Sequence, residues 1–250
     1  MKQFFLIAIT GIFMLSCKKE DKKQDGLESA KVEFHQGKTW SSLKLTNAGA
    51  PEQLILTLDS NVLRSVPAAG QPNHHEDEVL IPLPAKALET TPFKFIMLNW
   101  NASGHEPAGI YDLPHFDMHF YMNSPTEVAT FVDQSKLNTD PGQDYIPAMH
   151  MGGAAVPAMG KHWIDLTSPE LQGNTFMQTF IYGSYDGKIV FYEPMITLDF
   201  LKMTTSFQRP IPQPTKFSKA GFYPTVMQVT KQNGQVNIIL SGFVSRQASL

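Results

Sequence analysis

The chain has almost no cysteine, no apolar run long enough to cross a bilayer and no excess of positive charge. Cys17 is the single cysteine among 250 residues, which excludes an intramolecular disulfide and a zinc site made of several thiolates. The apolar stretch over 4–14 is too short to span a membrane as a helix. Because the formal net charge is −3, nucleic acid is not an expected partner.

The sequence also lacks the signatures of several enzyme classes. It contains no Gly-x-Ser-x-Gly, no P-loop, no dinucleotide-binding fingerprint and no His-Glu-x-x-His. Serine hydrolysis, phosphoryl transfer by a P-loop and zincin chemistry therefore have no support. What remains is a domain of unassigned chemistry, which is large enough to bury a core.

The N-terminus resembles the signal of a bacterial lipoprotein. Lys2 precedes the apolar stretch, and Leu15-Ser16 leads directly into Cys17. A small residue before a lone cysteine at this place is similar to a lipobox, which implies cleavage before Cys17 and lipidation of Cys17. Several acyl chains would then tether the protein to a membrane that it does not span. The alternative is an ordinary signal peptide followed by an incidental cysteine.

We expect three parts along the chain. They are a signal peptide over 1–16, the lipidated Cys17 with a charged tether over 17–27, and a single β-rich domain over 28–250. The tether begins Lys18-Lys19-Glu20-Asp21, and a lysine followed by two acids resembles the surface-export signal of Bacteroidetes lipoproteins. The expected location is the cell envelope, as an outer-membrane lipoprotein that is either periplasmic or surface-exposed.

Frequent chain breaks and alternating patterns predict a mainly β domain. The 18 prolines and 17 glycines favour short strands over long helices. We expect strands over 31–35, 39–45, 53–59, 79–83, 92–100 and 115–122, and a helix over 125–136 capped by Ser124. Asp186-Gly187 and Asn233-Gly234 predict two β-hairpins. The predicted fold is an antiparallel barrel or sandwich with one or two short helices.

The strand over 115–122 carries most of the candidate chemistry. Residues two apart on a strand share a face, so His115, Asp117 and His119 point to one side. The intervening residues Phe116 and Met118 point to the other side. A row of imidazole, carboxylate and imidazole is either a metal or acid–base site, or a hydrogen-bonded network facing a wet interior.

Strand spacing limits how this row can hold one metal ion. Neighbours two apart lie about 6.5 Å apart and those four apart about 13 Å, whereas Zn–N bonds are only about 2.0–2.1 Å long. One ion can therefore take His115 with Asp117, or Asp117 with His119. Taking both histidines requires a bend, which Pro114 could provide.

Three residues elsewhere can complete a metal site. His162 follows a glycine-rich loop over 152–155, Glu193 lies among aromatic residues where a carboxylate needs a partner, and His105 begins the turn before the His115 strand. Taken singly, they also fit a core histidine, a rim carboxylate and a turn residue. The predicted ligands for a divalent ion (Zn, Mn, Fe or Ni) are His115, Asp117, His119, His162 and Glu193. Tyr111 and Tyr121 are expected behind these ligands, in contact with them and not with the ion, and His105 either joins them there or completes the ligand set.

Two further readings stay open. Met149 and Met151 offer soft thioether sulfurs and His150 an imidazole, a set that could hold copper. Methionine is also a common filler of apolar loops. The sequence does not decide whether the protein is an enzyme. As an enzyme it would use a metal-bound water as base or nucleophile, with Tyr111 or Tyr121 as a proton donor. As a non-enzyme it would bind a small molecule or serve a structural role in the envelope.

Several segments together resemble a known family. They are Trp100-Asn101, Gly104-His105-Glu106-Pro107, Pro114-His115-Phe116-Asp117 with His119-Phe120-Tyr121, Met159-Gly160 with His162-Trp163, and Glu193-Pro194-Met195. The chain from about 40 to 245 resembles an uncharacterised family of secreted bacterial proteins related to a Thermus protein controlled by an extracytoplasmic-stress sigma factor. The resemblance implies a β-rich domain, a homo-oligomer and a link to envelope stress. It brings no assigned activity and no catalytic residues.

Overall fold

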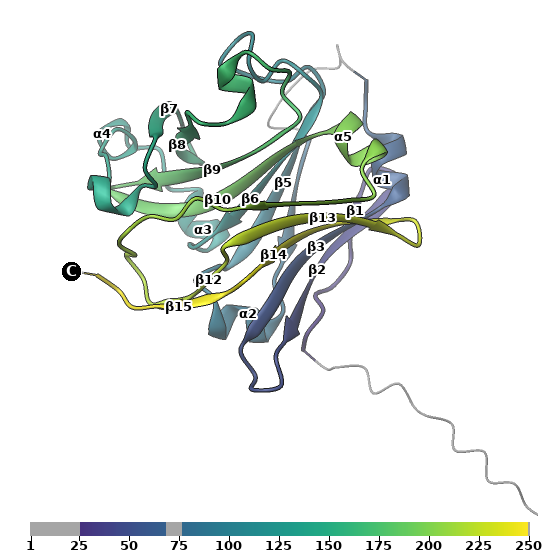
Figure 1. Ribbon diagram of the computed structural model, residues 1–250, viewed down its shortest axis with the longest axis horizontal. Coiled ribbons are helices and arrows are strands. Elements are labelled where there is room, and N and C mark those ends of the chain that lie inside the picture. The colour runs from purple at the N-terminus through teal and green to yellow at the C-terminus, as the bar shows by residue number, and fades with distance from the viewer. Residues whose placement is uncertain (1–25, 69–76, 250) are drawn as a thin grey trace, which may run out of the picture.

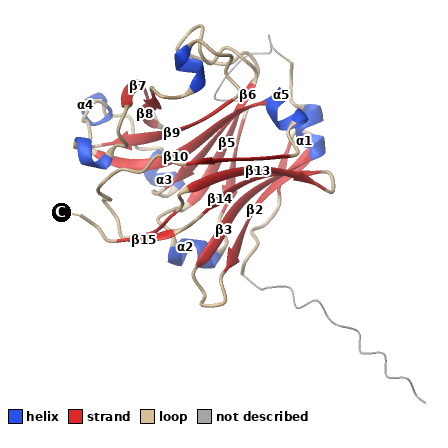
Figure 2. Cartoon of the chain, in the orientation of Figure 1, coloured by secondary structure: helices blue, strands red, loops and turns tan. Residues whose placement is uncertain are grey.

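Two antiparallel sheets make up most of the protein. The computed structural model describes residues 26–68 and 77–249, and strands dominate these ranges (Figure 1, Figure 2). Cys17, the predicted signal peptide and nearly all of the predicted tether lie outside the described residues. None of the helices in the described ranges has the length and apolarity that a membrane crossing requires.

The larger sheet has seven strands and carries the candidate site. Its strands run in the order β4-β5-β6-β10-β9-β8-β7. Their bounds are β4 (Glu78–Pro82), β5 (Phe95–Asn101), β6 (His115–Tyr121), β7 (His150–Val156), β8 (Gly160–Asp165), β9 (Gln178–Tyr185) and β10 (Lys188–Thr197). Strand β6 therefore lies inside the sheet, between β5 and β10.

The smaller main sheet has six strands in the order β1-β2-β3-β14-β13-β11. Their bounds are β1 (Val32–Phe34), β2 (Gly37–Leu45), β3 (Pro51–Asp59), β11 (Ser206–Pro210), β13 (Val226–Gln232) and β14 (Gln235–Ser241). A short pair, β12 (Gly221–Tyr223) and β15 (Val244–Arg246), forms a third sheet.

Both predicted hairpins are present, as β9–β10 and β13–β14. At their tips Asp186 and Gly187 have φ of 50° and 70°, and Asn233 and Gly234 have φ of 52° and 72°. Two consecutive residues with positive φ are the requirement of a type I′ turn, which asparagine, aspartate and glycine meet most easily. The two dipeptides in the sequence therefore specify these turns.

The main core lies between the two large sheets. Phe116, Met118 and Phe120 on β6 are fully buried in one cluster with Leu54 and Leu56 on β3. The fold is thus a sandwich, and it is not the closed barrel that the sequence left as an alternative. The row of His115, Asp117 and His119 lies on the other side of β6, because strand residues alternate between faces.

The helices are short, but they are more numerous than the one or two that the sequence predicts. The described ranges hold five α-helices and two 3₁₀ helices: α1 (Ser60–Ser65), α2 (Ala85–Thr90), α3 (Pro125–Val128), α4 (Gln134–Leu137), α5 (Leu198–Met203), η1 (Gln143–Tyr145) and η2 (Pro169–Gln172). The predicted helix over 125–136 is wrong as one element. The capping box at Ser124 forms and starts α3, but Asp133 is extended and its carboxylate caps α4, so the chain makes two helices.

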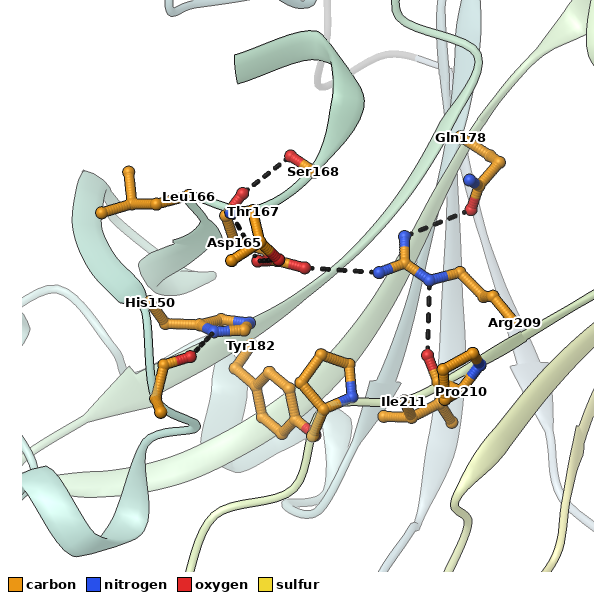
Figure 3. A network of polar contacts seen from close by, with 12 residues as sticks. His150, Asp165, Leu166, Thr167, Ser168, Gln178, Tyr182, Arg209, Pro210 and Ile211 are labelled. Carbon is orange, nitrogen blue, oxygen red and sulfur yellow. Dashed lines mark hydrogen bonds and ion pairs between the residues drawn. The ribbon is translucent and has the colours of Figure 1, made fainter. Parts of the chain in front are cut away.

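An ion pair connects the two large sheets at the C-terminal end of β8. Arg209 on β11 approaches Asp165 on β8, with 3.3 Å between Nη2 and Oδ2, and also donates to Gln178 on β9 (Figure 3). Asp165 is 3% exposed in its side chain and Arg209 is 14% exposed. The second carboxylate oxygen of Asp165, Oδ1, accepts hydrogen bonds from the backbone N–H and the hydroxyl of Thr167. This contact fixes the end of β8 relative to the six-stranded sheet.

Candidate metal centre

The face of the large sheet that is turned away from the main core carries two groups of histidine and carboxylate. His105, His115 and Asp117 form the first, here called the Asp117 cluster, and His119, His162 and Glu193 form the second, here called the Glu193 cluster. Within each cluster one ligand atom from every residue lies within 4.8 Å of the others. Each cluster therefore has the donors and the spacing to bind a divalent metal ion.

The Asp117 cluster forms where β6 meets the loop that precedes it. Nε2 of His115 lies 3.1 Å from Oδ1 of Asp117, and Nε2 of His105 lies 3.1 Å from Oδ2 of the same carboxylate. The amide of Asn101 on β5 donates to Oδ2 at 2.6 Å. Asn101 is paired with His115 in the register of β5 and β6, so the sheet itself delivers this amide to the cluster.

The Glu193 cluster joins three strands. Nε2 of His119 on β6 lies 3.3 Å from Oε1 of Glu193 on β10, and Nε2 of His162 on β8 lies 3.7 Å from Oε2. The side chains of His119 and Glu193 are each only 1% exposed. Gly183 on β9 lies beside His162, and its missing side chain leaves room for the ring of Phe191, which contacts both histidines.

Hydrogen bonds to backbone carbonyls fix the tautomers of three of these histidines. Nδ1 of His115 is 2.6 Å from the carbonyl of Leu113, and Nδ1 of His162 is 3.0 Å from that of Ala154. Nδ1 of His105 is 2.7 Å from the carbonyl of Glu106. A carbonyl can only accept, so Nδ1 carries the proton and a neutral ring has its lone pair on Nε2. Metal-ligating histidines are commonly held in this way.

In the neutral rings of His105, His115 and His162 the lone pair on Nε2 therefore faces a carboxylate oxygen, which also accepts. Four buried atoms in the described residues lack a hydrogen-bond partner at these contacts: Nε2 of His115, Oδ1 of Asp117, Nε2 of His119 and Oε2 of Glu193. Two acceptors at such short distance repel each other unless a cation lies between them. That cation is either a proton or a metal ion.

The two clusters take up protons differently. Although burial opposes ionisation of Asp117, His115 and His105 hold the pKa of its carboxyl well below the usual range. Burial likewise disfavours a charge on His105, but Asp117 outweighs it and raises the pKa of His105 to about 9. In the other cluster burial lowers the pKa of His119 to about 3 and raises the pKa of Glu193 well above its usual range.

A cavity of about 680 Å³ opens over this face of the sheet, and residues of both clusters line it. Asp117 and His105 reach it from the first cluster, and His162 reaches it from the second. His115 and His119 are 0% and 1% exposed and are not among the residues that line it. Each cluster thus borders the cavity through some of its residues, while His115, His119 and Glu193 are buried away from it.

The structure divides the five predicted ligands instead of collecting them around one ion. His115 and His119 are four apart on β6 and belong to different clusters, as strand spacing requires. His105 was predicted either to stand behind the ligands or to complete the set, and its Nε2 contacts Asp117 directly. The sequence did not single out Asn101 as a partner of Asp117, since only the pairing of β5 with β6 brings the two together.

The tyrosines expected behind the ligands occupy different positions. Tyr121 is buried, stacks on His119 with 5.7 Å between ring centroids and donates to the carbonyl of Met159. Tyr111 packs its ring edge-on against His105 and lines the cavity. Its buried hydroxyl has no hydrogen-bond partner among the described residues.

Met149, His150 and Met151 do not converge on one point. The glycine-rich segment expected to be a loop is the edge strand β7, with an irregular register between Gly152 and Ala155. His150 packs against Tyr182 (Figure 3), whereas Met151 lines the cavity. Met149 is 60% exposed. Copper ligation by all three would require this strand to change its conformation.

Comparisons with known proteins add no relative to this description. No family model matches the chain, and neither a curated protein nor a solved structure matches it significantly.

Proposed function

We propose that this protein is a divalent-metal-binding lipoprotein of the bacterial cell envelope. The observation that carries the proposal is that the Nε2 atoms of His115 and His162, whose Nδ1 atoms donate to carbonyls, face buried oxygens of Asp117 and Glu193. A metal ion between these atoms would satisfy every one of them at once. A single proton on Glu193 could be donated to only one of these two histidines at a time.

The donor set restricts the metal. Each cluster offers two imidazoles and one carboxylate, which suits zinc, manganese, iron(II) and nickel. Three protein ligands leave coordination positions for water or another molecule, as in catalytic rather than purely structural sites. In an enzyme, a metal held by the Asp117 cluster would activate a bound water, and Tyr111, whose ring packs against His105, would be the proton donor.

The envelope location rests on the N-terminal sequence. The lipobox-like Leu15-Ser16-Cys17 and the charged tether support attachment to the outer membrane through lipid on Cys17. The resemblance to secreted proteins linked to envelope stress supports the same location and suggests a homo-oligomer. Cys17→Ser should move the protein from the membrane fraction to the soluble fraction, whereas continued membrane attachment would argue against lipidation.

Metal content is the direct test of the proposal. The full chain with Cys17→Ser, which cannot be lipidated, is purified and measured by ICP-MS after gel filtration and after dialysis against each of the four metals. We expect up to two ions per chain. His115→Gln and His162→Gln should each remove one ion, and the double variant should remove both.

His150→Gln is the matched control, because His150 is a partly buried histidine outside both clusters. It should leave the metal content unchanged. Absence of all four metals from a folded protein would refute metal binding. The clusters would then be proton-sharing networks inside the fold.

A further inference from the structure

The cavity above the two clusters has the size and composition of a site for an organic molecule. Its volume of about 680 Å³ falls within the range of about 300–1,000 Å³ that is typical of small-molecule pockets. It extends from Met151, half exposed on the edge strand β7, down to Ile181 and Met195, which are 2% and 0% exposed. The molecule it fits would therefore enter past β7 and reach the sheet.

The walls of this cavity are apolar. Val156, Met159, Ile164, Ile181 and Met195 contribute aliphatic or thioether side chains. An apolar body would be stabilised there by burial, and the methionines can adapt to its shape.

The polar atoms of the cavity are concentrated beside the Asp117 cluster. Asp117 and His105 lie there with Tyr111, whose hydroxyl is buried and unpartnered among the described residues. Oδ1 of Asn99 is a second buried atom without a partner in that part of the chain. A hydroxyl donor beside a metal ion with open positions is suited to an oxygen anion that binds both.

No lysine or arginine is among the residues that line the cavity within the described part of the chain. An anionic group in this apolar space would need its charge balanced. Besides the imidazole of His105, which lines the cavity, a metal ion in the Asp117 cluster is the positive charge that the site could supply for that purpose.

We infer that the cavity binds an apolar organic carboxylate, with one carboxylate oxygen on the metal of the Asp117 cluster and the other accepting a hydrogen bond from Tyr111. This inference rests on the proposed metal binding. It adds the ligand class: an apolar body of moderate size that ends in a carboxylate.

The test compares two probes of matched shape. 4-Phenylbutyrate and its uncharged analogue 4-phenylbutan-1-ol are titrated by calorimetry into the full chain carrying Cys17→Ser, both zinc-loaded and metal-free. We expect 4-phenylbutyrate to bind the zinc-loaded protein at least tenfold more tightly than the metal-free protein. The alcohol should show no such dependence on zinc.

Two variants separate the hydrogen bond from the cavity. Tyr111→Phe should weaken 4-phenylbutyrate binding about tenfold at unchanged zinc content. Gly153→Leu should abolish it by filling the cavity, since a Cβ at Gly153 meets its nearest neighbours at 3.6 and 3.7 Å, which are ordinary contacts. Gly142→Leu places the same side chain at a glycine outside the cavity lining and should change nothing.

The outcomes distinguish this inference from the proposal beneath it. Zinc bound as expected, but with equal or absent binding of 4-phenylbutyrate in both forms, would overturn the inference and leave metal binding intact. Unchanged binding in Gly153→Leu would overturn the assignment to this cavity. Failure of zinc itself to bind would overturn the proposed function, and the inference with it.

Discussion

Asp117 and Glu193 are buried carboxylates on one face of one sheet, yet their surroundings favour opposite charge states. Two histidines contact Asp117 and an amide donates to it, so its ionised form is stabilised. Around Glu193, burial dominates and favours the neutral acid. A metal ion must displace a proton at either cluster, from His105 in the first and from Glu193 in the second.

Zinc binding at the Asp117 cluster should strengthen as the pH rises. The pKa of His105 is raised to about 9, so His105 is protonated at pH 7 and must lose that proton to bind zinc. Below this pKa, each pH unit increases the deprotonated fraction tenfold. We expect zinc affinity to rise about tenfold per unit between pH 7 and 8.5, measured by chelator competition in the His162→Gln variant, in which this cluster remains.

The matched variant is His105→Gln with His162→Gln. It should bind zinc more weakly and lose most of the slope with pH, because the imidazolium of His105 is no longer there to be deprotonated. An equal slope in both variants would mean that another group releases the proton.

At the scale of the elements, Gly183 connects sheet packing to the Glu193 cluster. It lies on β9 between Phe191 on β10 and His162 on β8. A Cβ at Gly183 would lie 1.9 Å from Cζ of Phe191, so the ring covers the glycine. The same ring contacts His119, with 4.9 Å between the centroids.

Gly183→Ala should lower the free energy of unfolding by about 1–3 kcal/mol, the usual cost of overpacking a core. It should also weaken zinc binding at the Glu193 cluster, because a displaced Phe191 moves its two histidine neighbours. Urea unfolding and zinc titration measure the two effects. Gly142→Ala is the control, since its Cβ would meet Tyr145 at an ordinary 3.6 Å. A Gly183→Ala protein as stable as this control would contradict the packing argument.

The sequence predicted the elements whose determinants are local. The I′ turns follow from Asp186-Gly187 and Asn233-Gly234, and the two-sided character of β6 follows from its alternation. The contact of His162 with Glu193 is different, because it depends on β8 and β10 flanking β9, an order that no short pattern encodes. The sequence also did not predict the break between α3 and α4. Asp133 is recognised as the N-cap of a second helix only from the structure, where its carboxylate accepts from the backbone of Ser135 and Lys136.

At the scale of the whole molecule, the pair of Arg209 and Asp165 ties one sheet to the other. Arg209→Met leaves Asp165 buried without its cation, so we expect the free energy of unfolding to fall by about 3 kcal/mol. Lys136→Met removes a pair that is about half exposed and should cost at most about 0.5 kcal/mol. Urea unfolding measures the free energy of unfolding of both variants. Equal losses would show that the buried pair of Arg209 and Asp165 stabilises the fold no more than the half-exposed pair does.

Metal should stabilise the folded protein as a whole. A ligand that binds only the native state adds about 2.7 kcal/mol at a free concentration one hundred times its dissociation constant. Two sites should add about twice that amount at saturation. We expect the urea midpoint to fall when EDTA replaces zinc, and to be insensitive to EDTA in the double variant His115→Gln, His162→Gln. A midpoint that ignores EDTA in the unsubstituted protein would count against both sites.

Strand β6 supplies ligands to both clusters on one face and Phe116, Met118 and Phe120 to the main core on the other. A shift of this strand by one residue against β5 and β10 would turn every imidazole and carboxylate toward the core and every phenyl ring toward the cavity. A protein with β6 paired one residue out of register would therefore bind no metal at either cluster. Insertion or deletion of a single residue within 115–121 should abolish folding and metal ligation together. Metal binding by this face of β6 therefore reports that the strand is paired in its correct register.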